Sequence, residues 1–194
     1  MGRKIYSNKK EKPEKIEKSK AQEIIGLVIY CLIVVIAMFL VIKFVGQRTI
    51  VIGDSMNPTL QDGENLITDK ITYRFTEPKR YDIIVFPYKD NPSKLLIKRI
   101  IGMPGETVQI IDGYVYINGH LLEEDYGNAV MNDSGTASEP IALGSDEYFV
   151  LGDNRNNSQD SRFASVGNIQ RSDIIGRAWL RIWPLDEITL LKHQ

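Results

Sequence analysis

Histidine and cysteine are almost absent from this sequence of 194 residues, which contains two histidines, His120 and His193, and one cysteine, Cys31. A single cysteine cannot form a disulfide within the chain and does not make a cysteine-based metal site. Two scattered histidines do not make a zinc site. The sequence therefore predicts a protein that uses neither a metal nor a cofactor.

The sequence also has no excess of charge of one sign, since its formal net charge is −1. A nearly neutral chain gives no electrostatic reason to expect a nucleic-acid partner. The charge is unevenly placed, however, since residues 1–23 contain eight Lys or Arg and four Glu. This stretch has few apolar residues and predicts a basic, disordered tail near anionic lipid.

One long apolar run follows the tail. Residues 24–42 are 19 residues without a charge, and about 20 residues match a hydrocarbon core of about 30 Å. A cleaved signal peptide would have a shorter apolar region and a small-x-small site, which residues 45–48 do not offer. We therefore expect a retained transmembrane helix over 24–45. The positive-inside rule predicts a single-pass protein of the cell membrane, with residues 1–23 cytoplasmic and 46–194 extracytoplasmic.

Helical periodicity is nearly absent from residues 46–194, apart from a turn near 172–175. Asp112-Gly113 and Asn118-Gly119 separate β-like runs and are strong hairpin signals. Pro87 is expected to end one strand, and the polar stretch 123–145 to form a surface excursion. The fold class is mainly antiparallel β, a sandwich or partial barrel behind one N-terminal transmembrane helix. The expected strands are 49–52, 65–68, 82–86, 95–101, 107–111, 114–117, 120–122, 148–151 and 178–183.

Ser55 lies in a stretch rich in turn-forming residues, 52–60 (IGDSMNPTL), about ten residues after the apolar run. A serine among Gly, Asp, Asn and Pro is most often an ordinary loop hydroxyl. A serine nucleophile needs a base, usually histidine. His120 directly follows a predicted turn and His193 is one residue from the C-terminus, so neither suits that role.

A neutral lysine is the alternative base, and it requires apolar surroundings without a close carboxylate. In a strand, Lys98 shares a face with Leu96 and Ile100. Lowering a lysine pKa from about 10.4 to about 8 costs about 3 kcal/mol, which would indicate function. An equally good interpretation is a lysine at the edge of a strand, whose aliphatic chain packs on the protein while its ammonium reaches solvent.

A third stretch, residues 152–162 (GDNRNNSQDSR), is dense in hydrogen-bonding side chains and follows an apolar run. Asn, Asp and Ser favour turns, so an ordinary loop is a credible interpretation. The alternating charges of Asp153 with Arg155, and of Asp160 with Arg162, could instead build a fixed network.

These stretches together resemble the boxes of bacterial type I signal peptidases, a membrane-anchored serine–lysine protease family, and in particular its short Gram-positive-like members. The matching boxes follow the family order and cover most of the outer domain. They are 55–60 (SMNPTL), 81–86 (YDIIVF), 98–106 (KRIIGMPGE), 152–162 (GDNRNNSQDSR) and 179–184 (WLRIWP).

The resemblance implies a role for each matching position. Ser55 would attack the scissile carbonyl, and its backbone N–H would donate to the oxyanion. Lys98 would be the general base, oriented by a hydrogen bond from Ser158. Some members have a second, side-chain oxyanion donor where this chain has Gly53, so that donor is unassigned. The expected structural supports are Asp160 with Arg162 and Asp153 with Arg155.

The resemblance also implies secretory preproteins as substrates. Their cleavage segment would bind in extended form against residues 49–52 and 95–97 by β-addition. Shallow apolar pockets would come from Val51, Leu60 and Ile97. We expect a monomer in the lipid bilayer.

Three alternatives stay open. One is a peptidase of the same fold dedicated to few substrates, such as a pilin or conjugation protein, and another is a non-catalytic peptide-binding β-module. A self-cleaving repressor is disfavoured by the anchor and by the lack of a DNA-reading helix pair.

Overall fold

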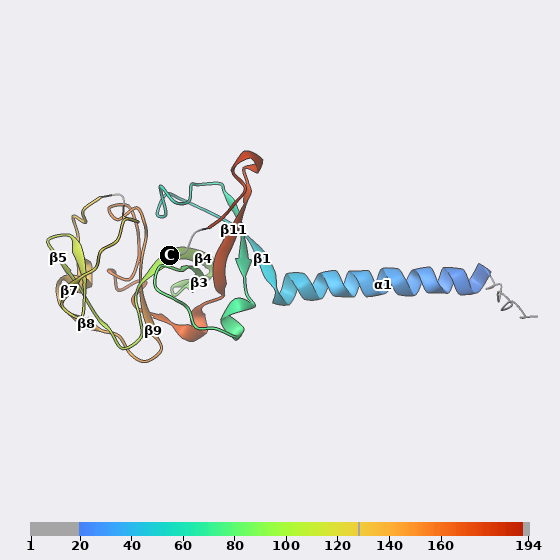
Figure 1. The fold of residues 1–194 in the computed structure, drawn as a ribbon, viewed down its shortest axis with the longest axis horizontal. Helices are drawn as coiled ribbons and strands as arrows, with labels where there is room; N and C mark the ends of the chain where they lie inside the picture. Colours follow the sequence, from blue (N-terminus) through green and yellow to red (C-terminus); the bar gives the residue numbers. More distant parts are fainter. Residues whose placement is uncertain (1–19, 128, 192–194) are drawn as a thin grey trace, which may run out of the picture. The chain divides into compact units, whose positions relative to one another are not determined.

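A computed structural model describes residues 20–127 and 129–191, which divide into two compact units between Leu40 and Val41. The expected apolar helix is present as α1 (Lys20–Phe44) and begins four residues earlier than predicted (Figure 1). It is long and apolar enough to cross a membrane, and none of the span Lys20–Val41 is buried. Most of the predicted tail lies outside the described residues.

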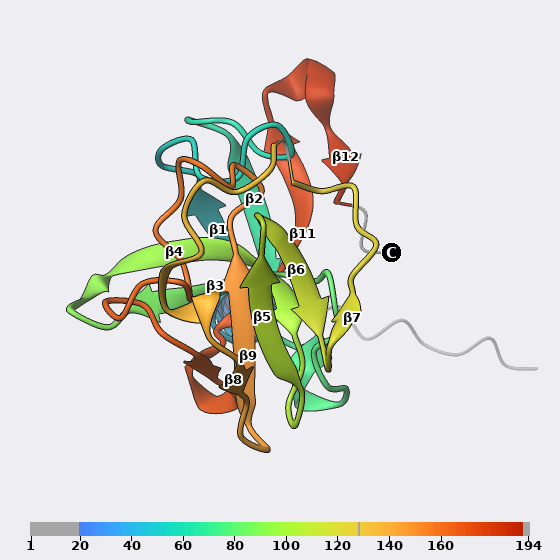
Figure 2. The same cartoon turned by 90° about the vertical axis from the view of Figure 1, so that its left-hand side faces the viewer.

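Two antiparallel sheets make up the second unit, which confirms the predicted fold class. In the larger sheet the strand order is β1-β2-β11-β3-β4-β9-β10, and β12 pairs with β11. Strands β1, β3, β4, β9 and β11 of this sheet are labelled in Figure 1. The smaller sheet has the order β7-β6-β5-β8, and three of these strands lie side by side in Figure 2. The larger sheet comprises β1 (Gly46–Ile50), β2 (Asn65–Asp69), β3 (Ile83–Tyr88), β4 (Asn91–Gly102), β9 (Glu147–Leu151), β10 (Ile169–Gln170), β11 (Gly176–Trp183) and β12 (Thr189–Leu190). The smaller comprises β5 (Thr107–Ile111), β6 (Tyr114–Ile117), β7 (His120–Leu121) and β8 (Ile141–Ala142). The short 3-10 turns are η1 (Thr72–Arg74), η2 (Gly135–Ser138), η3 (Arg171–Asp173) and η4 (Leu185–Glu187).

Both predicted hairpin turns are present. Asp112 and Gly113 have φ of 51° and 79°, and Asn118 and Gly119 have φ of 53° and 81°. Two successive residues in the left-handed region are what a two-residue type I′ turn requires. They connect β5 to β6 and β6 to β7.

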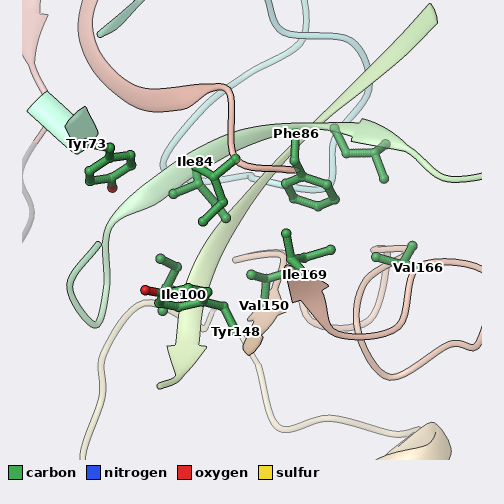
Figure 3. Packing of buried hydrophobic residues seen from close by; sticks show 10 residues of the cluster. Tyr73, Ile84, Phe86, Ile100, Tyr148, Val150, Val166 and Ile169 are labelled. Carbon is green, nitrogen blue, oxygen red and sulfur yellow. The ribbon is translucent and has the colours of Figure 1, made fainter. Parts of the chain in front are cut away.

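Strand β4 is interior from Arg99 onward and holds Lys98 in a buried position. It pairs with β3, where Lys98 faces Ile84, and with β9 from Arg99 onward. A lysine whose ammonium reaches solvent is excluded, because Lys98 is buried. Leu96 and Ile100, on the face of Lys98 by strand alternation, are buried in one apolar cluster with Ile84. Figure 3 shows Ile84 and Ile100 in this cluster.

Two expectations about the fold are wrong. Strand β3 continues through Pro87 to Tyr88, because β11 pairs with β3 only at Ile84 and Val85 and no ladder hydrogen bond is needed beyond them. The stretch 123–145 is not only a surface excursion. It adds β8 to β5, and Met131, Ala137 and Leu143 are buried against the smaller sheet.

Candidate active site

Ser55 and Lys98 lie in contact although 43 residues separate them in the sequence. Lys98 Nζ is 2.7 Å from Ser55 Oγ and 2.9 Å from the carbonyl oxygen of Ile97. The Lys98 residue is only 3% exposed. At this distance a neutral amine can accept the hydroxyl proton directly.

The pKa of Lys98 is lowered to about 8, and the largest cause is burial, which penalises the ammonium form. The charge of Lys94 lowers it further, whereas the carboxylates of Asp160 and Asp153 oppose the shift. Neither carboxylate pairs with Lys98, because Asp153 and Asp160 bind arginines instead. About a tenth of the lysine is therefore neutral at pH 7, and about half at pH 8.

The loop between β1 and β2 presents Ser55 from a fixed backbone. Strand β1 ends at Ile50, so Val51 and Ile52 lie in this loop rather than in the predicted strand. Met56 and Leu60 are buried, and Leu60 N–H donates to the Met56 carbonyl at 2.9 Å. The Ser55 carbonyl accepts a hydrogen bond from Asn154 N–H at 3.1 Å, which joins this loop to the 152–162 stretch.

The backbone around Ser55 bears on oxyanion binding. Among the described residues, no acceptor takes the Ser55 N–H. Gly53 has a φ of +83°, and its N–H donates to Asp62 Oδ1 at 2.7 Å. The Gly53 N–H is thus already bonded and does not serve as the second oxyanion donor. Gly53 has no side chain that could replace it.

Ser158 lies beside the dyad but does not make the expected hydrogen bond. Its Oγ is buried and has no hydrogen-bond partner among the described residues, while Nζ of Lys98 contacts Ser55 and Ile97. A Cβ added at Gly152 would lie 2.2 Å from Ser158 Oγ and 2.4 Å from the Ser55 carbonyl oxygen. Gly152 therefore permits the close approach of the two serines, a role that sequence reasoning missed.

Replacing Gly152 with alanine is expected to reduce cleavage activity by about tenfold or more, because backbone must shift at the nucleophile and a displacement of about 1 Å can cost 10²-fold. Steady-state cleavage of a preprotein measures the effect. Gly46→Ala is the matched control, since its added Cβ meets only ordinary contacts, the nearest at 3.4 Å. Equal activity of the Gly152→Ala variant and the wild type would contradict the packing role.

Asp153 connects all three catalytic stretches. Its carboxylate accepts from Arg99 Nε at 2.8 Å and Nη2 at 2.6 Å, and from Thr59 Oγ1 at 2.5 Å. The expected pairing with Arg155 is wrong, because Arg155 binds Glu124 at 2.5 and 2.7 Å. The β4–β9 register, which the sequence does not reveal, brings Arg99 close to Asp153.

The pair of Asp160 and Arg162 is present as expected. Arg162 Nε lies 2.8 Å from Asp160 Oδ1, and both side chains are buried. The second carboxylate oxygen of Asp160 accepts from Gly152 N–H at 3.1 Å. The pair therefore holds Gly152, the residue that packs against both Ser158 and the Ser55 carbonyl.

A groove of about 460 Å³ runs past Ser55 between residues 47–56 and 93–98. Val51 and Ile97 are among the residues that line it, as expected of substrate contacts. Leu60 is not, because the turn after Met56 directs it into the core, where it is fully buried. The assignment of Leu60 to a substrate pocket is therefore wrong.

No cluster of three metal-ligating side chains occurs among residues 20–127 and 129–191. His120 is exposed on β7, and His193 lies outside the described residues.

Comparison with known proteins gives one consistent result. A family model described as "Signal peptidase, peptidase S26" matches residues 21–183. "Signal peptidase I" of Leptolyngbya laminosa is 44% identical over 152 residues, 75% of this chain and 72% of that protein. "Signal peptidase I T" of Bacillus subtilis is 35% identical over 200 residues, 97% and 100% of the two chains. A crystal structure of a signal peptidase I from Enterococcus faecalis is 36% identical, with a TM-score of 0.44, and covers 53% of this chain and 97% of its own.

Proposed function

The chain belongs to the peptidase S26 family of signal peptidases, and we propose that it cuts its substrates with a catalytic dyad of Ser55 and Lys98. It is a membrane-anchored serine endopeptidase that removes N-terminal signal peptides from secretory preproteins. The observation that supports the dyad is the 2.7 Å contact between Ser55 Oγ and a buried lysine amine.

The chemistry runs in two halves. Neutral Lys98 accepts the hydroxyl proton while Ser55 Oγ attacks the scissile carbonyl carbon, and the ammonium then protonates the departing amine as the C–N bond breaks. The signal peptide remains as an ester on Ser55. In the second half Lys98 removes a proton from water, which attacks the ester; the Ser55 Oγ–carbonyl bond breaks, the Lys98 ammonium returns the proton to Ser55 Oγ, and the signal peptide leaves.

The Ser55 N–H is the proposed oxyanion donor. Its lack of an acceptor among the described residues supports this role, because a preorganised donor must be available for the developing charge. Removal of such a donor typically costs about 2.7–4 kcal/mol of transition-state stabilisation. Ser158 is proposed to orient Lys98 once substrate excludes water, and its unpaired buried hydroxyl is consistent with a partner gained in that state.

The substrate is proposed to lie extended in the groove between the β1–β2 loop and β4. An extended peptide can add its backbone hydrogen bonds to such a sheet-like edge. Val51 and Ile97 supply apolar walls for small side chains. Asp153 with Arg99 and Asp160 with Arg162 are proposed to hold the loops that carry the reacting groups.

The orientation in the membrane follows from charge. The basic first 23 residues favour a cytoplasmic N-terminus, which leaves the peptidase domain on the opposite side of the cell membrane. We also propose that α1 crosses the bilayer and that the protein acts as a monomer.

The pH profile of cleavage tests the proposed base. The active form of Lys98 is the neutral amine, so activity is expected to rise with pH through about 8 and level off above it. Values of kcat/KM for a preprotein over mildly acidic to alkaline pH measure this limb. A rate that stays flat across this range is incompatible with a lysine base of that pKa.

A further inference from the structure

The segment Asp69–Thr76, named the β2–η1 segment, exposes apolar side chains from a turn of fixed shape. Asp69 Oδ1 accepts hydrogen bonds from Ile71 N–H at 2.8 Å and Thr72 N–H at 3.0 Å, and its Oδ2 accepts from Thr72 Oγ1 at 2.5 Å. On this turn Phe75 is 81% exposed and Ile71 is 38% exposed. A fixed turn that holds a phenylalanine in solvent indicates a contact with something other than the core.

The same segment is bonded to the residue that follows α1. Lys70 N–H donates to the Val45 carbonyl at 3.0 Å, and Asp69 pairs with Gly46 in the β1–β2 ladder. The candidate span ends at Val41, four residues before Val45. Four residues reach at most about 14 Å. If α1 crosses a bilayer, the start of the β2–η1 segment, which is bonded to Val45, therefore lies close to the bilayer surface.

Positive charge gathers beside these apolar groups. Lys70, Arg74 and Arg171 line a hollow of about 380 Å³ together with Tyr73, Ile174 and Ile175. Arg171 binds Glu77 at 2.9 Å, whereas within the described part of the chain neither Lys70 nor Arg74 forms an ion pair. The Arg74 guanidinium lies 5.5 Å from the ring centre of Phe44, the last residue of α1. Two cations without ion-pair partners beside an exposed aromatic ring suit an anionic group at an apolar boundary.

We propose that Lys70 and Arg74 bind the phosphate of an anionic phospholipid while Phe75 enters the interfacial layer of the bilayer. Aromatic side chains favour this layer, and basic residues near it are attracted to anionic headgroups. The inference rests on the bilayer-spanning role of α1. The β2–η1 segment would then be a second attachment point, which restricts the orientation of the peptidase domain at the membrane.

The test uses the full chain in vesicles of phosphatidylcholine alone or with phosphatidylglycerol. A spin label is placed at position 75 through Phe75→Cys in a Cys31→Ser background, and its collisions with oxygen and with a water-soluble nickel chelate report immersion. The matched control is the same label at Tyr114→Cys, since Tyr114 is 52% exposed on β6, in the other sheet.

The label at position 75 is expected to be shielded by lipid in the anionic vesicles, and the label at position 114 to remain in water. Lys70→Gln and Arg74→Gln should each reduce the shielded population about fivefold, the factor that corresponds to about 1 kcal/mol per charge. A label at position 75 that stays in water would overturn the proposal. Shielding that depends on neither anionic lipid nor the two cations would overturn the headgroup site.

Two further measurements distinguish failure of this inference from failure of the α1 anchor and from a structural role of the two cations. A label on the native Cys31 reports α1, so a hydrocarbon-immersed Cys31 with an aqueous position 75 contradicts this inference alone and leaves the anchor intact. An aqueous Cys31 contradicts the anchor and this inference with it. Peptide cleavage in detergent should be unchanged in the Lys70→Gln/Arg74→Gln double variant, and a loss there would assign the two cations to the fold instead.

Discussion

Lys98→Met is expected to abolish preprotein cleavage while making the folded domain more stable. The loss of a general base lowers kcat by about 10²–10⁴-fold. Ser55→Ala should lose at least as much, and the double variant no more than the worse single variant, because the two groups act as one unit. Single-turnover cleavage of a preprotein whose signal peptide ends in Ala-x-Ala measures these rates.

The gain in stability has a separate physical origin. Folding lowers the pKa of Lys98 from 10.5 to about 8, so below pH 8 the folded protein holds a buried ammonium at a cost of about 3 kcal/mol. The unfolded chain binds more protons between pH 8 and 10.5, so the free energy of unfolding of the wild type should rise with pH through that window. Methionine fills similar space without a charge, so the variant should lack this rise and gain most below pH 8.

Denaturant unfolding of both proteins across this pH range checks the sign. Ser55→Ala is the control, because it removes the nucleophile and leaves the buried amine in place. A methionine variant that is inactive and also less stable than the wild type would show that Lys98 supports the fold. It would contradict the claim that burial of the Lys98 amine destabilises the folded protein.

Asp153→Ala is expected to destabilise the domain by about 3–5 kcal/mol, because it leaves the buried guanidinium of Arg99 without a counter-charge. The Arg99 and Asp153 side chains are 1% and 0% exposed, so solvent cannot replace the lost partner. Thr59 also loses its acceptor, which frees the Ser55 loop. The fraction of activity lost should therefore exceed the fraction of the protein that is unfolded.

A second ion pair provides the matched control for this substitution. Glu77→Ala removes the partner of Arg171, but Glu77 is 78% exposed, and such surface pairs contribute about 0–1 kcal/mol. The free energies of unfolding of the two variants, measured by chemical denaturation, should therefore differ by several kcal/mol. Similar stability of the Asp153→Ala variant and the wild type would show that the Arg99 pair does not support the site.

The sequence predicted the dyad better than its surroundings, for a physical reason. The local patterns of Ser55 and Lys98, a turn and an apolar-faced strand, left other roles open, and the resemblance of the boxes in family order assigned the dyad without knowledge of which strands pair. The partner of Asp153 could not be predicted in this way. Sequence proximity favoured Arg155, whereas the β4–β9 register brings in Arg99 from 54 residues away.

The errors at Leu60 and in the stretch 123–145 have the same source. Leu60 follows the motif serine closely, but one turn of backbone sends it into the core instead of the groove. Polar composition hid the buried residues Met131 and Leu143, because a few apolar side chains suffice when a loop packs on a sheet. Gly152 opens a matching box, but its packing role gave no signal, since that role depends on the contact between two loops.

The ionisation of Lys98 is the most direct test of the central claim, that a buried neutral lysine activates Ser55. Carbon-13 labelling of lysine side chains and an NMR titration, with Lys98→Met to assign the signal, would measure its pKa in the folded protein. A buried base of this kind should titrate with a midpoint near 8. A midpoint near the ordinary value of 10.5 would mean that the amine is charged at working pH, and it would contradict the proposed mechanism.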